Sequence, residues 1–329
     1  MVIPTLAADL RLRECLESLG RQTLRDFEVI IVDNSGENLV RRNPLPPGTR
    51  TLENARNTGF GAAINQGLGA SSAPYLATLN DDAVAHPRWL EALVRALERR
   101  PDAGMCASQV RFFGEERLDS AGMLVAGDGS SKQRGHGRTP DDFPVAEETL
   151  FPSGSAALYR RAMLEETGGF DDRFFLYCED TDLGLRARWA GWKCLYVPEA
   201  VVEHHYSHSS SGASPVKAYY VERNRLFVLA KNFPAAMLPA APFVSLARYF
   251  WHLWYIVQGR GSAARFRAEG NAGPRMLWYI LRAHVSLAAN LRRLWGQRRA
   301  IRARARITPA VFRHLVRCHS ISARKVAAL

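Results

Sequence analysis

Hydrophobic and polar positions along the first 110 residues change repeatedly between two patterns, one typical of buried strands and one typical of amphipathic helices. Short apolar runs predict strands over residues 1–6, 27–32, 51–54, 75–79 and 104–110. Apolar residues three or four positions apart predict helices over residues 11–19 and 89–97, and a further helix entered at residues 57–65. Strands that alternate with helices predict an α/β fold with a doubly wound, mostly parallel sheet.

The pattern is less regular between residues 114 and 205. Residues 114–148 are glycine-rich and polar, which favours a mobile loop or a hairpin over a site. A run of apolar and small residues predicts a strand over Phe151–Arg161, where another group must approach closely. We expect residues 191–205 to form a strand pair that ends in His204 and His205.

Three carboxylates follow the aromatic run Phe174–Tyr177, and an amphipathic helical pattern begins directly after them. They are Glu179, Asp180 and Asp182. Acids at the start of a helix are stabilised in the ionised form by its dipole, and an ionised carboxylate is what a general base requires. The structural alternative is helix capping, since Asp and Glu are common in first turns for structural reasons alone.

Acidic residues also follow two of the predicted strands. Asp33 ends one strand, and Asp81 and Asp82 follow another. In open α/β sheets, ligands bind beyond the carboxyl ends of the strands. Carboxylates combined with His204 or His205 suit Mn²⁺ or Mg²⁺. The alternatives are an Asx turn for the two acids and a structural role for the histidines.

Charge is distributed unevenly along the 329 residues, whose net charge is +12. Residues 234–329 hold 17 Lys and Arg against one acid, a balance of +16, whereas residues 1–233 hold 27 against 31, a balance of −4. We therefore expect a nearly neutral domain over residues 1–233 and a basic helical region over residues 234–329. A basic region next to a nearly neutral domain indicates an anionic partner, either a membrane surface or nucleic acid.

The basic region contains two aromatic stretches, residues 237–258 and 276–295, in which apolar residues are interrupted by Arg, His or Pro. Neither reaches the ~20 apolar residues of a spanning helix, so we expect helices in a membrane interface. The alternative is that these helices pack on the nearly neutral domain and on each other, or form a dimer. Arg298–Arg306 would add attraction to anionic lipid.

The five cysteines are scattered and contain no Cys-x-x-Cys pair, which argues against a disulfide framework and against a zinc site. No basic, apolar leader opens the sequence. We expect a cytoplasmic protein, peripheral at the inner face of the cell membrane.

Several short motifs, in order from Val2 to about Pro234, resemble the family 2 glycosyltransferases, and within them bacterial rhamnosyltransferases of cell-surface polysaccharide synthesis. The motifs are Val-Ile-Pro-Thr (2–5), Val-Asp-Asn-Ser (32–35), Asn-Thr-Gly-Phe-Gly-Ala-Ala-Ile-Asn-Gln-Gly (57–67), Leu-Asn-Asp-Asp-Ala (79–83), the acidic stretch 168–187, Ala-Gly-Trp (190–192), Val-Pro-Glu-Ala-Val-Val-Glu-His-His (197–205) and Glu-Arg-Asn-Arg-Leu (222–226). Each motif is weak alone, but their common order is specific.

The resemblance implies a GT-A fold and an inverting, metal-dependent transfer from a nucleotide sugar to a saccharide or polyprenyl-linked acceptor. It implies that Asp82 and His204 hold Mn²⁺ or Mg²⁺, and that Asp180 is the base, with Glu179 and Asp182 orienting either the base or the acceptor. The residues implied to bind the nucleotide sugar are Pro4, Thr5, Asp33, Asn34, Gly59, Asn65, Asp81 and Arg223, with Arg225 as a further candidate for the diphosphate. The family often has Pro where this chain has Asp81, which leaves open which acid holds the metal.

Two other functions remain as alternatives. Arginines interleaved with aromatic residues in the basic region also suit nucleic-acid binding, but the acids at the strand ends would repel phosphates, so we expect no nucleic-acid partner. A nucleotidyl transferase would keep the fold, yet the sequence lacks a glycine-rich opening with Lys or Arg to hold a triphosphate. Sugar transfer, with rhamnose as the expected sugar, therefore ranks first.

Overall fold

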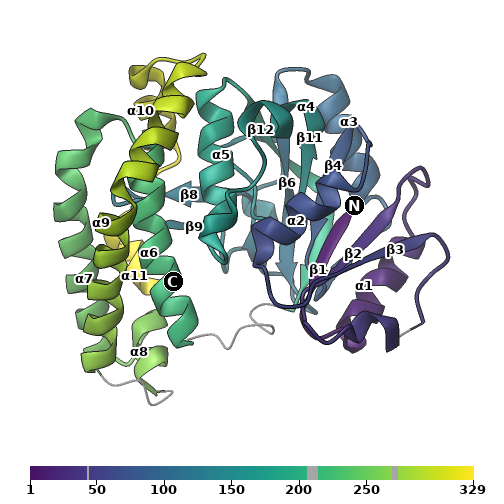
Figure 1. The fold of residues 1–329 in the computed structure, drawn as a ribbon, viewed down its shortest axis with the longest axis horizontal. Helices are drawn as coiled ribbons and strands as arrows, with labels where there is room; N and C mark the ends of the chain where they lie inside the picture. The colour runs from purple at the N-terminus through teal and green to yellow at the C-terminus, as the bar shows by residue number, and fades with distance from the viewer. Residues whose placement is uncertain (43, 206–213, 269–272) are drawn as a thin grey trace. The chain divides into compact units, whose positions relative to one another are not determined.

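The computed structural model describes residues 1–42, 44–205, 214–268 and 273–329 (Figure 1). The chain divides into two compact units that interleave along the sequence. The first unit comprises Met1–Met123, Gln133–Phe175 and Trp192–Ser209, and the second comprises Leu124–Lys132, Leu176–Gly191 and Ser210–Leu329. The boundary expected after residue 233 lies inside the second unit, which also takes up two earlier segments of the chain.

Among the described residues, ten strands form one sheet, and all of them belong to the first unit. They are β1 (Val2–Thr5), β2 (Val29–Asp33), β3 (Thr49–Glu53), β4 (Tyr75–Leu79), β5 (Ala83–Ala85), β6 (Ala103–Phe112), β7 (Leu118–Ser120), β10 (Glu147–Thr149), β11 (Ala156–Arg160) and β12 (Lys193–His204). The order is β10-β12-β6-β11-β4-β1-β2-β3, with β5 paired to β12 and β7 to β6.

Strands β3, β2, β1 and β4 are parallel neighbours, and so are β6 and β12. Strand β11 lies between β4 and β6 and is antiparallel to both. The predicted α/β fold with a mostly parallel sheet is confirmed. The antiparallel direction of β11 is a finding of the structure, because a run of apolar residues does not indicate strand direction.

Helices pack on both faces of this sheet because alternate strand residues point to opposite sides. Helices α1 (Leu10–Gly20) and α3 (Trp89–Arg99) share one core with Ile3 and Ile31. On the other face, Gly67 of α2 (Phe60–Gly69) lies against Val2, and Met163 of α4 (Arg161–Thr167) lies against Gly104. The carboxyl ends of β1, β2 and β4 are thereby held at one edge, where the predicted acids lie.

The expectation of a strand pair over residues 191–205 is wrong. β12 is one strand of 12 residues that runs parallel to β6, with a shift in register between Val197 and Val201. Pro198 lies inside that shift, where its missing N–H costs no ladder hydrogen bond. A bulge at a proline therefore produces the sequence pattern of a turn. In residues 114–148, β8 (Met123–Val125) pairs with β9 (Ser131–Gln133), which is the hairpin alternative.

The described part of the second unit is helical apart from residues of β8 and β9. Its helices are α5 (Glu179–Trp189), α6 (Pro215–Asn232), α7 (Ala241–Val257), α8 (Gly261–Ala268), α9 (Gly273–Ala303), α10 (Pro309–Cys318) and α11 (Ala323–Ala328). Helix α6 runs along α9, and α7 packs against α8 and α11 (Figure 1). Both aromatic stretches of the basic region are helical, as predicted.

Candidate active site

The register of β5 and β12 determines which acid meets a histidine. His204 of β12 pairs with Ala83 of β5, and Asp82 directly precedes that residue. His204 Nε2 therefore lies 3.1 Å from Asp82 Oδ1, while His204 Nδ1 lies 3.1 Å from Asp119 Oδ2. All three side chains are buried. The structure thus brings together Asp82 and His204, which the resemblance pairs as metal ligands.

Each member of this group is held in its charged form. Burial alone would lower the pKa of His204, but the hydrogen bonds to Asp119 and Asp82 outweigh it and raise the pKa to about 10. Burial would likewise raise the pKa of Asp82, but the contact with His204 and its charge bring the pKa below its ordinary value. The pKa of Asp119 is also lowered, since His136 and His204 outweigh burial.

Asp82 and His204 could supply one oxygen and one nitrogen donor to a divalent cation. Asp82 Oδ1 is buried without a well-aligned hydrogen bond among the described residues. In its charged form His204 presents an Nε2–H to Asp82, so the ring would have to give up this proton before Nε2 could bind a cation, while Asp119 keeps the Nδ1 side in place. The described residues contain no group of three or more His, Cys, Asp and Glu side chains arranged for an ion. A cation here would therefore take its other ligands from water and substrate phosphates.

His205 points elsewhere. Its ring stacks on Phe113 with 3.8 Å between centroids, and its Nε2 lies 3.3 Å from Glu14 Oε2. Of the two histidines that the sequence left open, His204 is the one that faces Asp82.

Asp81 faces the end of β1. Thr5 Oγ1 donates a hydrogen bond of 2.6 Å to Asp81 Oδ2. Burial, together with the neighbouring charge of Asp82, raises the pKa of Asp81 to about 6, although the Thr5 hydrogen bond opposes the shift. Pro4 and Thr5 pair in register with Val32 and Asp33 of β2. Residues predicted to line the nucleotide therefore lie at adjacent strand ends.

Asp33 and Asn34 are both engaged by neighbouring loops. The Asp33 carboxylate is 1% exposed and accepts hydrogen bonds from Ser35 and from the Val40 backbone N–H. Burial would raise the pKa of Asp33, but these hydrogen bonds lower it. Asn34 Nδ2 donates to the Gly59 carbonyl at 3.3 Å. In this structure the two side chains hold the loops after β2 and before α2.

The backbone at Gly59 leaves no room for a side chain. Its φ is +91°, and an added Cβ would lie 2.3 Å from the Phe175 carbonyl oxygen. The same oxygen accepts a hydrogen bond of 2.8 Å from Phe60 N–H at the start of α2. The loop before α2 therefore lies directly against the backbone of Phe175.

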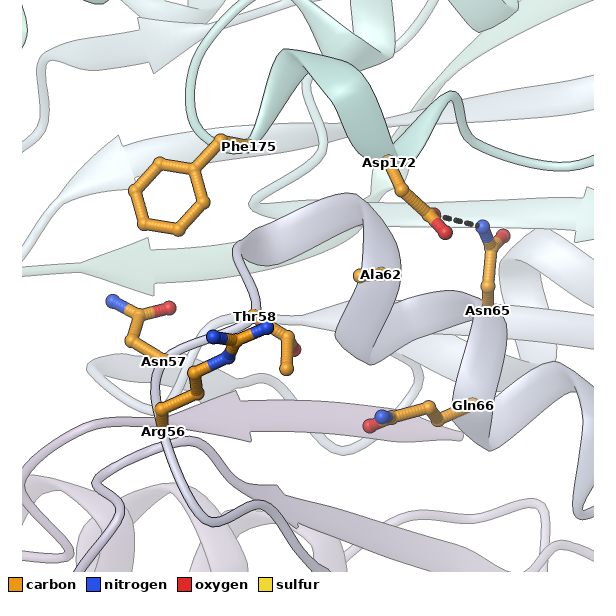
Figure 2. Close-up of a pocket in the computed structure, with 8 residues that line it drawn as sticks. All are labelled: Arg56, Asn57, Thr58, Ala62, Asn65, Gln66, Asp172 and Phe175. Atoms are coloured by element: carbon orange, nitrogen blue, oxygen red, sulfur yellow. Dashed lines mark hydrogen bonds between the residues drawn. The ribbon is translucent and has the colours of Figure 1, made fainter.

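A pocket of about 760 Å³ opens at this loop, and Figure 2 shows its lining. The lining residues are Arg56, Asn57, Thr58, Ala62, Asn65, Gln66, Asp172 and Phe175. Asn65 Nδ2 donates a hydrogen bond of 2.7 Å to Asp172 Oδ1 across the pocket edge (Figure 2). Asn65, which the resemblance places along the donor, lines this pocket, and Gly59 directly follows the lining residue Thr58. Sequence reasoning missed Arg56, which directly precedes the motif at 57–67, and Asp172, which lies in the motif at 168–187 but was not singled out.

The three predicted acids of the second unit follow a constrained backbone. Tyr177 and Cys178 have φ values of +70° and +64°, a region that non-glycine residues rarely adopt. Asn224 Nδ2 donates hydrogen bonds of 2.8 and 2.6 Å to the carbonyls of Leu176 and Tyr177. Asn224 therefore holds the segment that leads into α5. Its only sequence signal is its place in the Glu-Arg-Asn-Arg-Leu motif.

The acids themselves have three different environments. Glu179 is buried, its Oε2 has no hydrogen-bond partner among the described residues, and burial followed by the charge of Asp180 raises its pKa to about 8. Asp182 is fully buried and accepts hydrogen bonds from Arg186, Lys231 and Asn232. Asp180 is partly exposed.

Of these three acids, Asp180 has the most access to a ligand. Asp182 is enclosed by its hydrogen-bond partners in the second unit. Burial raises the pKa of Glu179 to about 8, so Glu179 is mostly protonated at pH 7. A general base must be within reach of the group whose proton it takes, and of the three acids only Asp180 is partly exposed.

The two arginines of α6 differ as well. Arg225 is 0% exposed and is enclosed by Glu222 and Asp128, so it serves neither as a solvated residue nor as a ligand for a diphosphate. Arg223 Nε donates to Asn224 Oδ1 at 2.8 Å, and its guanidinium lies 4.5 Å from the centroid of Tyr220. Burial lowers the pKa of Arg223.

Two named rhamnosyltransferases are similar to this chain in sequence. The chain is 30% identical over 235 residues to an N-acetylglucosaminyl-diphospho-decaprenol L-rhamnosyltransferase from Mycobacterium tuberculosis, a match that covers 64% of this chain and 76% of the relative. It is 25% identical over 215 residues to an O-antigen chain rhamnosyltransferase from Salmonella anatum, covering 64% of this chain and 66% of the relative.

Two solved structures share the fold. The first is GalNAc-T7 with UDP, GalNAc and Mn²⁺, with a TM-score of 0.59 and 16% identity, over 75% of this chain and half of that protein's chain. The second is a mannosyltransferase from Pyrobaculum calidifontis with GDP-Man and Mn²⁺, with a TM-score of 0.51 and 19% identity, over 90% of this chain and 86% of the other. At these identities the likeness establishes the fold alone, and the expected GT-A fold is confirmed.

The family described as Glycosyl transferase family 2 matches residues 1–168, which include the strand ends at Thr5, Asp33 and Asp82 and the loop at Gly59. With this match and the sequence identity to the mycobacterial relative, the chain belongs to glycosyl transferase family 2 and is a glycosyltransferase.

Proposed function

We propose that this glycosyltransferase moves rhamnose from a nucleoside-diphosphate donor to a hydroxyl of a lipid-linked saccharide acceptor, with inversion at the anomeric carbon. The observation that carries the proposal is the pair Asp82 and His204, oriented by Asp119 at the end of the sheet. The choice of rhamnose and of a lipid-linked acceptor rests on the names of the two rhamnosyltransferase relatives. Nucleic-acid binding and nucleotidyl transfer are not favoured, because the family match indicates sugar transfer.

Asp82 and His204 would hold the cation, Mn²⁺ or Mg²⁺, and the ion when bound neutralises charge on the diphosphate. Asp119 keeps the His204 ring in place through its 3.1 Å contact with Nδ1. Thr5, Asp81 and Asn65 would position the donor from the strand ends and from α2, within the loops that Asp33, Asn34 and Gly59 hold in place.

Asp180 would act as the general base. It takes the proton of the acceptor hydroxyl while the acceptor oxygen forms a bond to the anomeric carbon. The bond from that carbon to the diphosphate oxygen breaks, and the nucleoside diphosphate leaves with the bonding electrons. Asp182 would act as a positioning residue, because its hydrogen bonds to Arg186, Lys231 and Asn232 fix the first turn of α5.

The first test is calorimetric binding of thymidine, uridine and guanosine diphosphates, each with and without Mn²⁺. We expect metal-dependent binding of one nucleotide by the wild type and its loss in Asp82→Ala. Glu98→Ala, which removes an exposed carboxylate of α3, is the matched control and should bind normally. Equal binding by Asp82→Ala and wild type would contradict the assignment of the metal site.

The base is tested separately. Asp180→Asn should keep metal-dependent nucleotide binding but lose sugar transfer by a factor of about 10²–10⁴, the usual contribution of a positioned base. Transfer by Asp180→Asn at the wild-type rate would exclude Asp180 as the base, whatever the identity of the sugar.

A further inference from the structure

One side of α7 carries a continuous row of large apolar side chains that are exposed. The row consists of Phe243, Leu246, Phe250, Leu253, Trp254 and Val257, whose exposed fractions lie between 49% and 83%. Their spacing of three and four residues places them on one face of the helix. Monomeric soluble proteins rarely expose large contiguous apolar patches, which usually mark an interaction site.

This face carries no charge. The only charged residue of α7, a helix that the structure describes completely, is Arg248, and it is 6% exposed. Its guanidinium makes hydrogen bonds to Asp128 and Glu222 at 2.7 and 2.9 Å. Arg248 therefore points into the second unit, and the opposite side of the helix is left to the apolar row.

Cations lie next to the row. Arg324 of α11, which packs along α7, lies 4.9 Å from the ring centroid of Trp251, and exposed Lys325 follows it. Exposed Arg260 follows the last turn of α7. Between Pro234 and Leu329 the sequence has 17 basic residues and one acid, so a partner for this face should combine an apolar interior with anionic groups at its surface.

An anionic lipid bilayer has this chemistry. Within residues 1–42, 44–205, 214–268 and 273–329, no helix has the length and apolar character needed to cross a membrane. An amphipathic helix of this type lies instead in the plane of the interface, with its apolar side among the upper acyl chains. A helix of 17 residues is about 25 Å long, enough to lie along such a surface.

We propose that α7 docks the protein on an anionic membrane surface, with its row of apolar side chains between the lipids and Arg260, Arg324 and Lys325 at the headgroups. The proposal deepens the proposed function, because a lipid-linked acceptor is presented at such a surface. It rests on the proposed function only in that respect, since binding to lipid requires no sugar transfer.

A second copy of the chain is the other possible occupant of this face. Two-fold pairing through α7 would put the arginines beside the row of both copies at one interface, with no acid of α7 to compensate them. The charges therefore favour lipid, and self-association becomes an outcome of the test.

The test is co-sedimentation of the full chain with vesicles of phosphatidylcholine alone and of phosphatidylcholine with phosphatidylglycerol. The double variant Phe250→Ser/Leu253→Ser removes the middle of the row and should weaken binding to the mixed vesicles by roughly tenfold or more. The control Leu10→Ser/Val311→Ser removes two apolar side chains that are 64% and 46% exposed on other helices and should bind like the wild type.

The charged part of the surface has its own test. Arg260→Ser/Arg324→Ser should weaken binding to the mixed vesicles by roughly fivefold per arginine at low salt and leave binding to phosphatidylcholine unchanged. The proposal is wrong if the wild type does not sediment with mixed vesicles, or if the α7 double variant binds them like the control. It is also wrong if sedimentation velocity shows a dimer that the α7 variant converts to monomers.

Sugar transfer to a water-soluble acceptor, measured on the same variants, separates this proposal from the proposed function. We expect the α7 variant to transfer to that acceptor at the wild-type rate. Vesicle binding without any sugar transfer by the wild type would support α7 docking and contradict the proposed function.

Discussion

Two single residues determine backbone positions on which the proposed site depends. Gly59 allows the loop before α2 to approach the carbonyl of Phe175, and Asn224 holds the carbonyls of Leu176 and Tyr177 ahead of α5. Backbone in rarely populated regions costs about 1–3 kcal/mol per residue and is often found at functional sites. Each residue acts through the backbone and not through contact with the reacting atoms.

Gly59→Ala should destabilise the loop before α2, because the new Cβ would lie 2.3 Å from a carbonyl oxygen at a φ of +91°. We expect a loss of more than about 1 kcal/mol in the free energy of unfolding and weaker nucleotide binding. Gly69→Ala is the control, since a Cβ there meets nothing within 4 Å and its backbone is helical. Equal effects of the two substitutions in urea unfolding would show that the close approach is unimportant.

The sequence could identify some of these residues but not the partners that orient them. Asp82, His204 and His205 lie in short motifs, so the sequence could name them as candidate metal ligands, but it left open which histidine faces Asp82. Asp119 lies in the polar stretch 114–148, where no spacing or motif distinguishes it from other acids. Its place beside His204 follows from the pairing of β7 with β6 and of β6 with β12, a tertiary effect.

At the scale of elements, hydrophobic periodicity predicted most strands and helices close to their observed bounds. Tyr75–Leu79 forms β4 with the predicted ends, because its five residues pair with β11 along their whole length. The prediction failed for β12, where the bulge around Pro198 resembled a turn. Periodicity reports which side chains are buried, but it does not show that two apolar runs continue as one strand.

Helices α6 and α7 are joined by a buried network of charges that periodicity does not reveal. Arg225 and Arg248 contact Asp128 and Glu222, and all four side chains are buried. Burial raises the pKa of each acid, but Arg248 and Arg225 outweigh it, so the pKa of Glu222 and that of Asp128 both lie below their ordinary values of 4.5 and 3.8.

This network predicts a loss of stability in acid. Because folding lowers these pKa values, the unfolded chain binds more protons than the folded chain once the pH falls below about 4.5. The network therefore stabilises the protein above that pH. This stabilisation is lost as the pH falls toward the pKa values of the folded state. The expected slope is about 1.4 kcal/mol per pH unit for each acid. Urea unfolding between pH 7 and pH 3 measures it.

Glu222→Gln provides the comparison. At pH 7 the variant should be less stable than the wild type, because the buried arginines lose one of their two negatively charged partners. Its stability should nevertheless fall less steeply in acid. Parallel stability curves for the two proteins would contradict a role of Glu222 in acid unfolding.

At the scale of the whole molecule, the basic C-terminal region is a structural part of the second unit. Trp189 of α5 stacks on Phe312 of α10 with 4.2 Å between ring centroids. The guanidinium of Arg302, a residue of α9, lies 3.3 Å from the centroid of the Trp189 ring. Trp189 Nε1 donates to the Asn232 carbonyl. The helix that carries Asp180 is therefore held by residues more than a hundred positions later in the chain.

Phe312→Ala should loosen α5 as well as α10. Removing a fully buried aromatic ring costs about 3–5 kcal/mol of the free energy of unfolding. Val311→Ala, at the neighbouring position that is 46% exposed, should change it by less than about 0.5 kcal/mol. Hydrogen exchange resolved by segment should show faster exchange in α5 only for Phe312→Ala. Unchanged exchange in α5 would mean that the stacked pair does not hold that helix.

The sequence by itself determined the α/β class, most element positions, the acids at the strand ends and the apolar, basic character of the last hundred residues. These features can be predicted locally, because burial periodicity and short motifs involve only residues that are close together in the sequence. The tertiary structure decided that the two units interleave, that His204 and not His205 faces Asp82, that Asp182 is enclosed while Asp180 is accessible, and that one face of α7 stays uncovered. Each of these depends on strand register or helix packing between residues far apart in the chain, which no local pattern encodes.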